Sequence, residues 1–138
     1  MIDFDNGAKY VGNMNEDRQF EGEGTLYYPD SSVCYQGHWR NNLFSGHGCL
    51  HAPRPSEKVN SVNYVNFSKN AKDCWDRYEG EFLGDKKNGR GVLYFGSDEK
   101  FTGQFSNDLI HGEGTFCHAN GKKVKGVWKN NRLFSVLK

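Results

Sequence analysis

This sequence of 138 residues has few prolines, almost no net charge and no long apolar run. It has 3 prolines and a formal net charge of +1, and no apolar run approaches the roughly 18 residues of a membrane-spanning helix. No signal-peptide hydrophobic region follows Met1. These absences argue against a membrane-spanning helix, and the charge balance gives no global field that would attract nucleic acid.

Glycine and aromatic residues are plentiful instead. Gly contributes 17 residues and aromatics 14% of the chain, while hydrophobic residues reach only 36%. Rings packed against positions without side chains suit a β-structure better than a two-layer core. The sequence has four cysteines and no sign of secretion. This combination indicates reduced thiols and a cytoplasmic location.

Five short segments share one form, which is a large residue, any residue, Gly, any residue and a second large residue. They are YVGNM (10–14), YQGHW (35–39), YEGEF (78–82), FTGQF (101–105) and VKGVW (124–128). The last three begin 23 residues apart, and the first two begin 25 apart. Chance does not produce five such registers, so the chain is an array of repeats.

A Gly-x-Gly pair follows four of these segments. The pairs are Gly22 and Gly24, Gly46 and Gly48, Gly89 and Gly91, and Gly112 and Gly114. The spacing predicts a partial repeat at 1–9, repeats at 10–34, 35–51, 78–100 and 101–123, a terminal half repeat at 124–138, and an insertion of about 52–77 in the second repeat.

Strand alternation places the large residues and glycines of each repeat on one face and the polar residues on the other. A lone hairpin is marginal in water, so the hairpins must stack. We predict an all-β fold, an elongated single-layer twisted antiparallel sheet of consecutive β-hairpins. In it, a ring from one repeat lies over the glycines of the next. The structural glycines are Gly12, Gly22, Gly24, Gly37, Gly46, Gly48, Gly80, Gly89, Gly91, Gly103, Gly112, Gly114 and Gly126.

The segments YQGHWRNNLFSGHGCL and YEGEFLGDKKNGRGVLYF resemble the MORN repeat (membrane occupation and recognition nexus). The resemblance covers nearly the whole chain outside 52–74. It departs from the pattern where Met14 replaces the second aromatic, where Val124 replaces Tyr, and in the turns, which keep Gly only near Gly84. It implies the same sheet, with a trough that can hold a partner's extended or helical segment.

This pattern leads us to expect a non-enzymatic scaffold or adaptor, placed in the cytoplasm or at a membrane or cytoskeletal structure. Its protein partner would contact rings that a single layer leaves accessible. They are Tyr35, Trp39, Tyr78, Phe82, Phe101, Phe105 and Trp128. In the alternative, these rings serve packing alone.

The sequence is compatible with two other functions. Residues 119–138 contain six bases and no acid, so Lys122, Lys123, Lys125 and Lys129 are candidates for contact with anionic lipid, or form a solvated polar face. MORN arrays also occur beside lipid-kinase and SET methyltransferase domains, as the resemblance implies. The chain would then be a regulatory fragment of a larger enzyme.

Catalytic patterns are not recognisable. No Cys or Ser lies in a known nucleophile setting, and no helix follows the Gly-x-Gly pairs to bind phosphate. We expect no enzymatic activity and no cofactor. One candidate metal site exists, because Cys34, Cys49 and His51 fall on the polar face of one hairpin and such ligands bind Zn²⁺. Otherwise they are ordinary exposed residues.

The insertion carries loop signals at Pro53 and Pro55 and strand-like residues in SVNYVNF. It is either a lengthened hairpin or a contact surface specific to this protein. The open edges of the sheet are a further candidate surface, for self-association.

Overall fold

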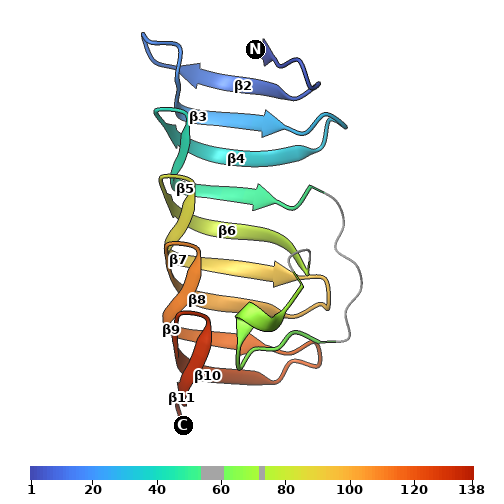
Figure 1. Ribbon diagram of the computed structural model, residues 1–138, viewed down its shortest axis with the longest axis vertical. Coiled ribbons are helices and arrows are strands. Elements are labelled where there is room, and N and C mark those ends of the chain that lie inside the picture. The colour runs from blue at the N-terminus through green and yellow to red at the C-terminus, as the bar shows by residue number, and fades with distance from the viewer. Residues whose placement is uncertain (54–60, 72–73) are drawn as a thin grey trace.

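The computed structural model describes residues 1–53, 61–71 and 74–138, and its strands form one antiparallel sheet in chain order (Figure 1). The strands are β1 (Ile2–Asp3), β2 (Lys9–Met14), β3 (Phe20–Tyr27), β4 (Val33–Arg40), β5 (Leu43–His51), β6 (Trp75–Leu83), β7 (Lys86–Phe95), β8 (Lys100–Ser106), β9 (Leu109–Cys117), β10 (Lys123–Lys129) and β11 (Arg132–Val136). The two termini lie at opposite ends of the sheet. The predicted all-β array of hairpins is confirmed.

Four hairpins close with two-residue turns in which both central residues have positive φ. The turns are Asn41–Asn42, Gly84–Asp85, Asn107–Asp108 and Asn130–Asn131. This left-handed geometry twists the chain in the same sense as the flanking strands, and Asn, Asp and Gly tolerate it best. The asparagine pairs of the sequence are therefore the hairpin turns.

An unbroken row of paired glycines crosses the sheet. Each glycine lies directly opposite the next, in the order Gly12, Gly24, Gly37, Gly48, Gly80, Gly91, Gly103, Gly114 and Gly126. Because a glycine has no side chain, this row forms a channel along the sheet that other groups fill.

A β-bulge follows the glycine row in every hairpin. The register shifts between Gly12 and Met14, Gly37 and Trp39, Gly80 and Phe82, Gly103 and Phe105, and Val127 and Trp128. Bulges bend and twist the strands that carry them. The turn ends of the hairpins consequently bend out of the plane of the sheet, along the left side of Figure 1.

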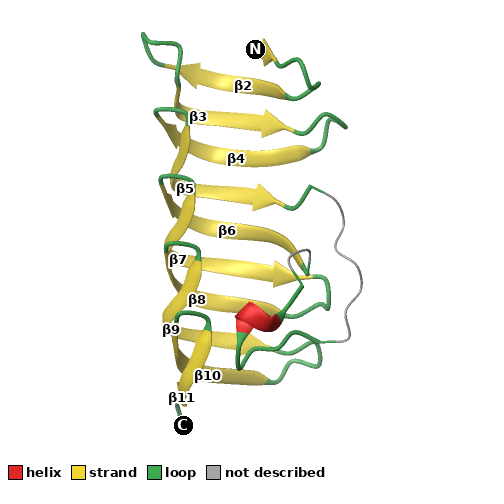
Figure 2. Ribbon diagram, in the orientation of Figure 1, coloured by secondary structure: helices red, strands yellow, loops and turns green. Residues whose placement is uncertain are grey.

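The insertion is the lengthened connection of the β5–β6 hairpin, since these strands pair directly from Gly46–Phe82 to His51–Arg77. β6 begins at Trp75, so this strand starts within the last residues of the predicted insertion of about 52–77. Residues 67–69 form a single 3₁₀ turn, η1 (Phe67–Lys69) (Figure 2). Pro55 lies outside the described residues. In the described part of the chain, no helix is long and apolar enough to cross a membrane.

Candidate functional site

One face of the sheet carries a row of large side chains that lie opposite one another across the strands; we call it the ring face. The row runs Tyr10, Leu26, Tyr35, Leu50, Tyr78, Leu93, Phe101, Phe116 and Val124. The glycine row lies on the same face, two residues from the ring row on each strand and on the side of the hairpin turns. Rings and glycines therefore share one side, as predicted.

The first ring of each hairpin fills the space over glycines of its own hairpin. A Cβ added to Gly48 would lie 2.1 Å from the Tyr35 hydroxyl, and one added to Gly91 would lie 2.3 Å from that of Tyr78. The predicted placement, over glycines of the next repeat, is wrong. The glycine row brings the second strand of the same hairpin directly beside the ring, so that strand supplies the vacancy.

The second ring of each hairpin joins it to the preceding one. Trp39 contacts its own Tyr35 edge-on at 5.0 Å and Tyr10 of the preceding hairpin at 5.5 Å. Its indole N–H donates to the carbonyl oxygen of Gly24, 3.0 Å away. Met14 takes the same position in the first hairpin, where it pairs with Phe20.

The seven rings predicted to bind a partner are enclosed by the protein itself. Tyr35, Trp39, Tyr78, Phe82, Phe101, Phe105 and Trp128 are only 0 to 4% exposed. The expectation that a single layer leaves them accessible is wrong, because the bent turn ends and the insertion cover them. A partner can contact only the side chains that lie around and above these rings.

A further position, which the sequence analysis missed, supplies part of this cover. It lies on the second strand, directly opposite the second large residue of the first strand, and is occupied by Phe20, Phe44, Lys87, Ile110 and Leu133. Phe20 stacks on Tyr10 at 3.7 Å and Phe44 on Tyr35 at 4.0 Å. The last three members of the set are 23 residues apart, so the repeat period is the signal that could have found them.

Lys87 is the one charged member of this set. Its side chain is 17% exposed, and its ammonium lies 4.0 Å from Asp108 and within 5.5 Å of the ring centres of Trp75 and Tyr78. Burial lowers the pKa of Lys87, while the charge of Asp108 opposes that shift. The cation partly replaces the stacked phenyl ring of the first two hairpins.

The second residue of each two-residue turn clasps the hairpin before it. Asn42 accepts the N–H of Phe20 at its side-chain oxygen, and its own N–H donates to the Phe20 carbonyl. The same two bonds join Asp85 to Phe44, Asp108 to Lys87, and Asn131 to Ile110. These four residues were also missed, although their side chains recur at the repeat spacing.

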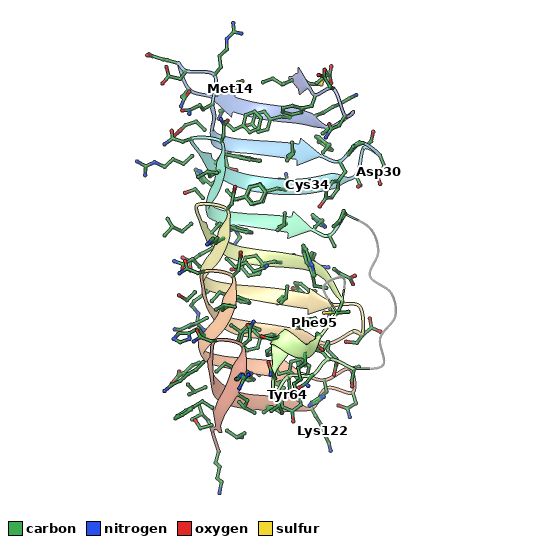
Figure 3. The ribbon with its side chains drawn as sticks, viewed as in Figure 1. Met14, Asp30, Cys34, Tyr64, Phe95 and Lys122 are labelled. Carbon is green, nitrogen blue, oxygen red and sulfur yellow. The ribbon has the colours of Figure 1, made fainter. Side chains whose placement is uncertain are left out.

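Residues 61–70 of the insertion lie across the ring face over β7 to β10, and we call them the resident segment (Figure 3). Tyr64 stacks on Phe116, with ring centres 4.9 Å apart. Phe67 is buried and contacts Phe101 edge-on at 5.6 Å. The lengthened-hairpin interpretation is confirmed, and the role of the insertion as a contact surface for other molecules stays a prediction.

Hydrogen bonds to its main-chain atoms also hold the resident segment. The Trp128 indole N–H donates to the carbonyl of Tyr64 at 2.8 Å. The N–H of Leu133 donates to the carbonyl of Val65, and the N–H of Phe67 to the carbonyl of Asn131, each at 2.8 Å. Asn66 also forms an isolated β-bridge with Arg132.

The other half of the ring face, over β2 to β5, carries no such segment among the described residues (Figure 1). Its half-buried side chains are apolar, and they are Phe20, Leu26, Phe44 and Leu50. We call these four residues the N-terminal groove, a name for an open apolar strip on the sheet and not for an enclosed cavity. Phe4 and Met14 lie at this end of the sheet and are exposed.

The candidate metal ligands meet only in part. Cys49 Sγ lies 3.5 Å from His51 Nε2, and burial raises the pKa of both Cys34 and Cys49. Within the described ranges, no three His, Cys, Asp or Glu side chains gather in a way that could hold a metal ion. Cys34, Cys49 and Cys117 are free thiols.

The four lysines predicted to contact lipid are all exposed. Lys123, Lys125 and Lys129 alternate along β10, which places them together on the face opposite the ring face. Beside them, the apolar residues Phe134 and Leu137 of the last strand and tail are also exposed, and Lys129 lies 4.0 Å from the centre of the Phe134 ring.

These features define a linear β-hairpin repeat protein whose hairpins are joined by rings, glycines and turn clasps on one face. The chain belongs to the MORN repeat family, whose model matches residues 19–33, 35–53, 78–99 and 101–123, more than half of its length. Repeats of this family indicate a repeat module that is commonly associated with proteins or membranes. No curated protein matches the chain.

Proposed function

We propose that the chain is a non-enzymatic protein-interaction module whose N-terminal groove binds a polypeptide segment of a partner protein. One observation carries the proposal: the other half of the same face already holds a polypeptide, the resident segment, through rings and main-chain bonds. A repeat array presents the same kind of surface again at each period. The N-terminal groove is the portion of that surface without an occupant among the described residues.

The partner is expected to present apolar side chains. The groove is lined by phenyl and leucine groups, and contiguous exposed apolar surface on a protein marks an interaction site. Leu26 and Leu50 are the residues to test, because each lies in the ring row between two first rings and keeps partial exposure.

A pull-down from the native cell, comparing matched variants, tests this assignment. Leu26→Gln with Leu50→Gln changes the groove, whereas Val11→Gln makes a similar change on the opposite face, where Val11 is exposed. A protein captured by the unaltered chain should be retained by Val11→Gln and lost by the double variant. Equal capture by both variants, with both folded by circular dichroism, would contradict the groove.

Binding to anionic lipid is a second candidate, and the exposed apolar residues beside the lysines favour it. Each Lys near an anionic surface contributes about 1 kcal/mol, and apolar side chains at the interface add to this. The tip formed by Lys125, Lys129, Phe134 and Leu137 combines both contributions.

Vesicle sedimentation separates the two functions. The chain should sediment with phosphatidylserine-containing vesicles and not with phosphatidylcholine alone, and salt should weaken the binding because it screens charge. Lys125→Glu with Lys129→Glu should abolish sedimentation, while the groove variants should leave it unchanged. Sedimentation that is indifferent to these charge reversals excludes the tip as the lipid site.

A further inference from the structure

We propose that the surface of the sheet beneath the resident segment, which we call its seat, is an exchangeable peptide site. A partner binds there through an extended stretch that bears two aromatic side chains three positions apart. The proposal rests on the proposed function of the ring face and names the chemistry of the partner. The resident segment shows which groups of an occupant the sheet recognises.

Aromatic side chains are the first recognition element. Tyr64 and Phe67 are three residues apart, and each lies against rings of the sheet, chiefly Phe116 and Phe101. Between them, the Val65 side chain is 54% exposed, so the sheet does not select for its shape. An occupant therefore needs a ring at each of the two outer positions and tolerates variety between them.

Main-chain atoms are the second element. The sheet donates from Trp128 to the carbonyl of the first ring residue, and from Leu133 to the carbonyl of the next. It accepts at Asn131 from the N–H of the second ring residue. Any sequence can supply these backbone groups, so they contribute affinity while the rings contribute specificity.

A buried carboxylate is the third element. Glu99 is 3% exposed and accepts the N–H of Val62, two residues before the first ring, at 2.7 Å. Its other oxygen lies 3.3 Å from His118 Nδ1. The Ser97 hydroxyl donates to the same Glu99 oxygen at 2.8 Å, so an N–H brought by the occupant is the second donor there and adds a hydrogen bond to a buried carboxylate. The order of the three elements defines the register of the bound stretch.

The resident segment is suited to exchange because it is not a strand of the sheet. Two rings, the buried Val62 side chain and a few hydrogen bonds hold it, whereas each strand is held by a ladder of paired residues. Segments with few such bonds open at lower free energy than the strands beneath them. Its covalent connection gives it a local concentration on the order of millimolar, which a partner must overcome.

The test supplies the occupant in trans. A fluorescein-labelled peptide of residues 61–70 is titrated into the unaltered chain and into the Tyr64→Ala, Phe67→Ala variant, whose own segment lacks both rings. Fluorescence anisotropy should show binding to the variant with a Kd at least about tenfold lower than to the unaltered chain, where the seat is filled. A peptide with Ala at both ring positions is the control and should bind neither chain.

A second variant checks the site itself. Adding Trp128→Phe to the double variant keeps a ring and removes the N–H that meets the peptide carbonyl, so the peptide should bind severalfold more weakly. If the double variant does not fold by circular dichroism, Tyr64→Ala alone replaces it and should bind the peptide more tightly than the unaltered chain.

Two results would overturn the exchange. One is no peptide binding to a folded variant, and the other is equal binding to variant and unaltered chain. Neither result bears on capture by the N-terminal groove, which is measured with Leu26 and Leu50 on a chain whose resident segment is intact. The two proposals can therefore fail separately.

Discussion

The two glycines of each Gly-x-Gly pair are needed for different reasons. Gly46 has φ of 66°, a left-handed backbone that side chains disfavour, and its neighbours leave ordinary space around it. Gly48 has an ordinary backbone, but its missing side chain is where the Tyr35 ring lies. Conformation therefore demands the first glycine, and packing demands the second.

Gly48→Ala should destabilise the chain by about 1 to 3 kcal/mol, because the new methyl group meets an enclosed tyrosine ring that has little room to move. Urea unfolding monitored by tryptophan fluorescence measures the change. Gly84→Asn is the control, since three sister turns carry Asn at that place and a Cβ there meets nothing within 4 Å. Equal stability of the two variants would show that the ring does not require the vacancy.

Because of the buried tyrosine hydroxyls, the free energy of unfolding depends on pH in the alkaline range. The Tyr35 and Tyr78 hydroxyls donate to the carbonyl oxygens of His38 and Glu81, and burial raises the pKa of both above the usual 10.0. The unfolded chain then releases these protons first as pH rises. The stabilisation is therefore fully present below pH 10.0 and is lost above it, up to the raised pKa of the folded state.

Unfolding free energies measured from about pH 8 to pH 11 should fall above pH 10 in the unaltered chain. In Tyr35→Phe with Tyr78→Phe the fall should be shallower, because two of the linked protons are gone. Phe101 already occupies the same position without a hydroxyl, so the fold accepts this change. An unchanged slope in the double variant would assign the pH dependence to other groups.

At the scale of the element, a hairpin is joined to its predecessor at two places. The second ring packs against the first ring of the earlier hairpin, as Phe82 does against Tyr35 at 5.3 Å. At the turn, the clasp adds two hydrogen bonds from one residue, as Asp85 forms with Phe44. Stability along the array is then a sum over neighbouring hairpins, as in other repeat proteins.

Asn42→Gly should cost about 1 kcal/mol, the usual contribution of one hydrogen bond. Glycine keeps the positive φ of 70° at this position and removes only the side-chain oxygen that accepts the Phe20 N–H. Thermal unfolding measures the loss. Asn42→Asp, which retains the oxygen as Asp85 and Asp108 do, should stay within a few tenths of the unaltered value. A similar loss in both variants would argue against the clasp.

At the scale of the whole molecule, the two halves of the ring face are covered in different ways. In the first two hairpins, Phe20 and Phe44 cover the rings from within each hairpin. In the later hairpins, Lys87, Ile110 and Leu133 hold that position, and Phe67 reaches in from the insertion to supply a ring. The insertion thus completes the core of the C-terminal half.

Phe67→Ala should therefore lower stability by about 3 kcal/mol, the lower end of the cost of removing an enclosed phenyl group. Hydrogen exchange should speed up chiefly at the Phe67 and Leu133 amides, which donate between the insertion and the β10–β11 end of the sheet. Val65→Ala, at an exposed neighbour, is the control and should be close to neutral. Faster exchange spread evenly over β2 to β5 would show that the insertion does not stabilise the C-terminal half in particular.

Much of this protein was predictable because its sequence repeats. The spacing of Tyr35, Gly37 and Trp39, echoed at Tyr78, Gly80 and Phe82, determined strands, hairpins and the shared face of rings and glycines, since strand alternation depends only on local geometry. The family followed from the same residues.

Tertiary structure alone decided what covers the rings. Bulges bend the turn ends over them, and a bulge is a shift of register between two strands, which one strand's residues do not encode. The place of Phe67 likewise depends on surfaces distant in sequence, Phe101 and Trp128, that exist only once the later hairpins have stacked. Local pattern determined the sheet, and long-range packing determined which part of it stays open.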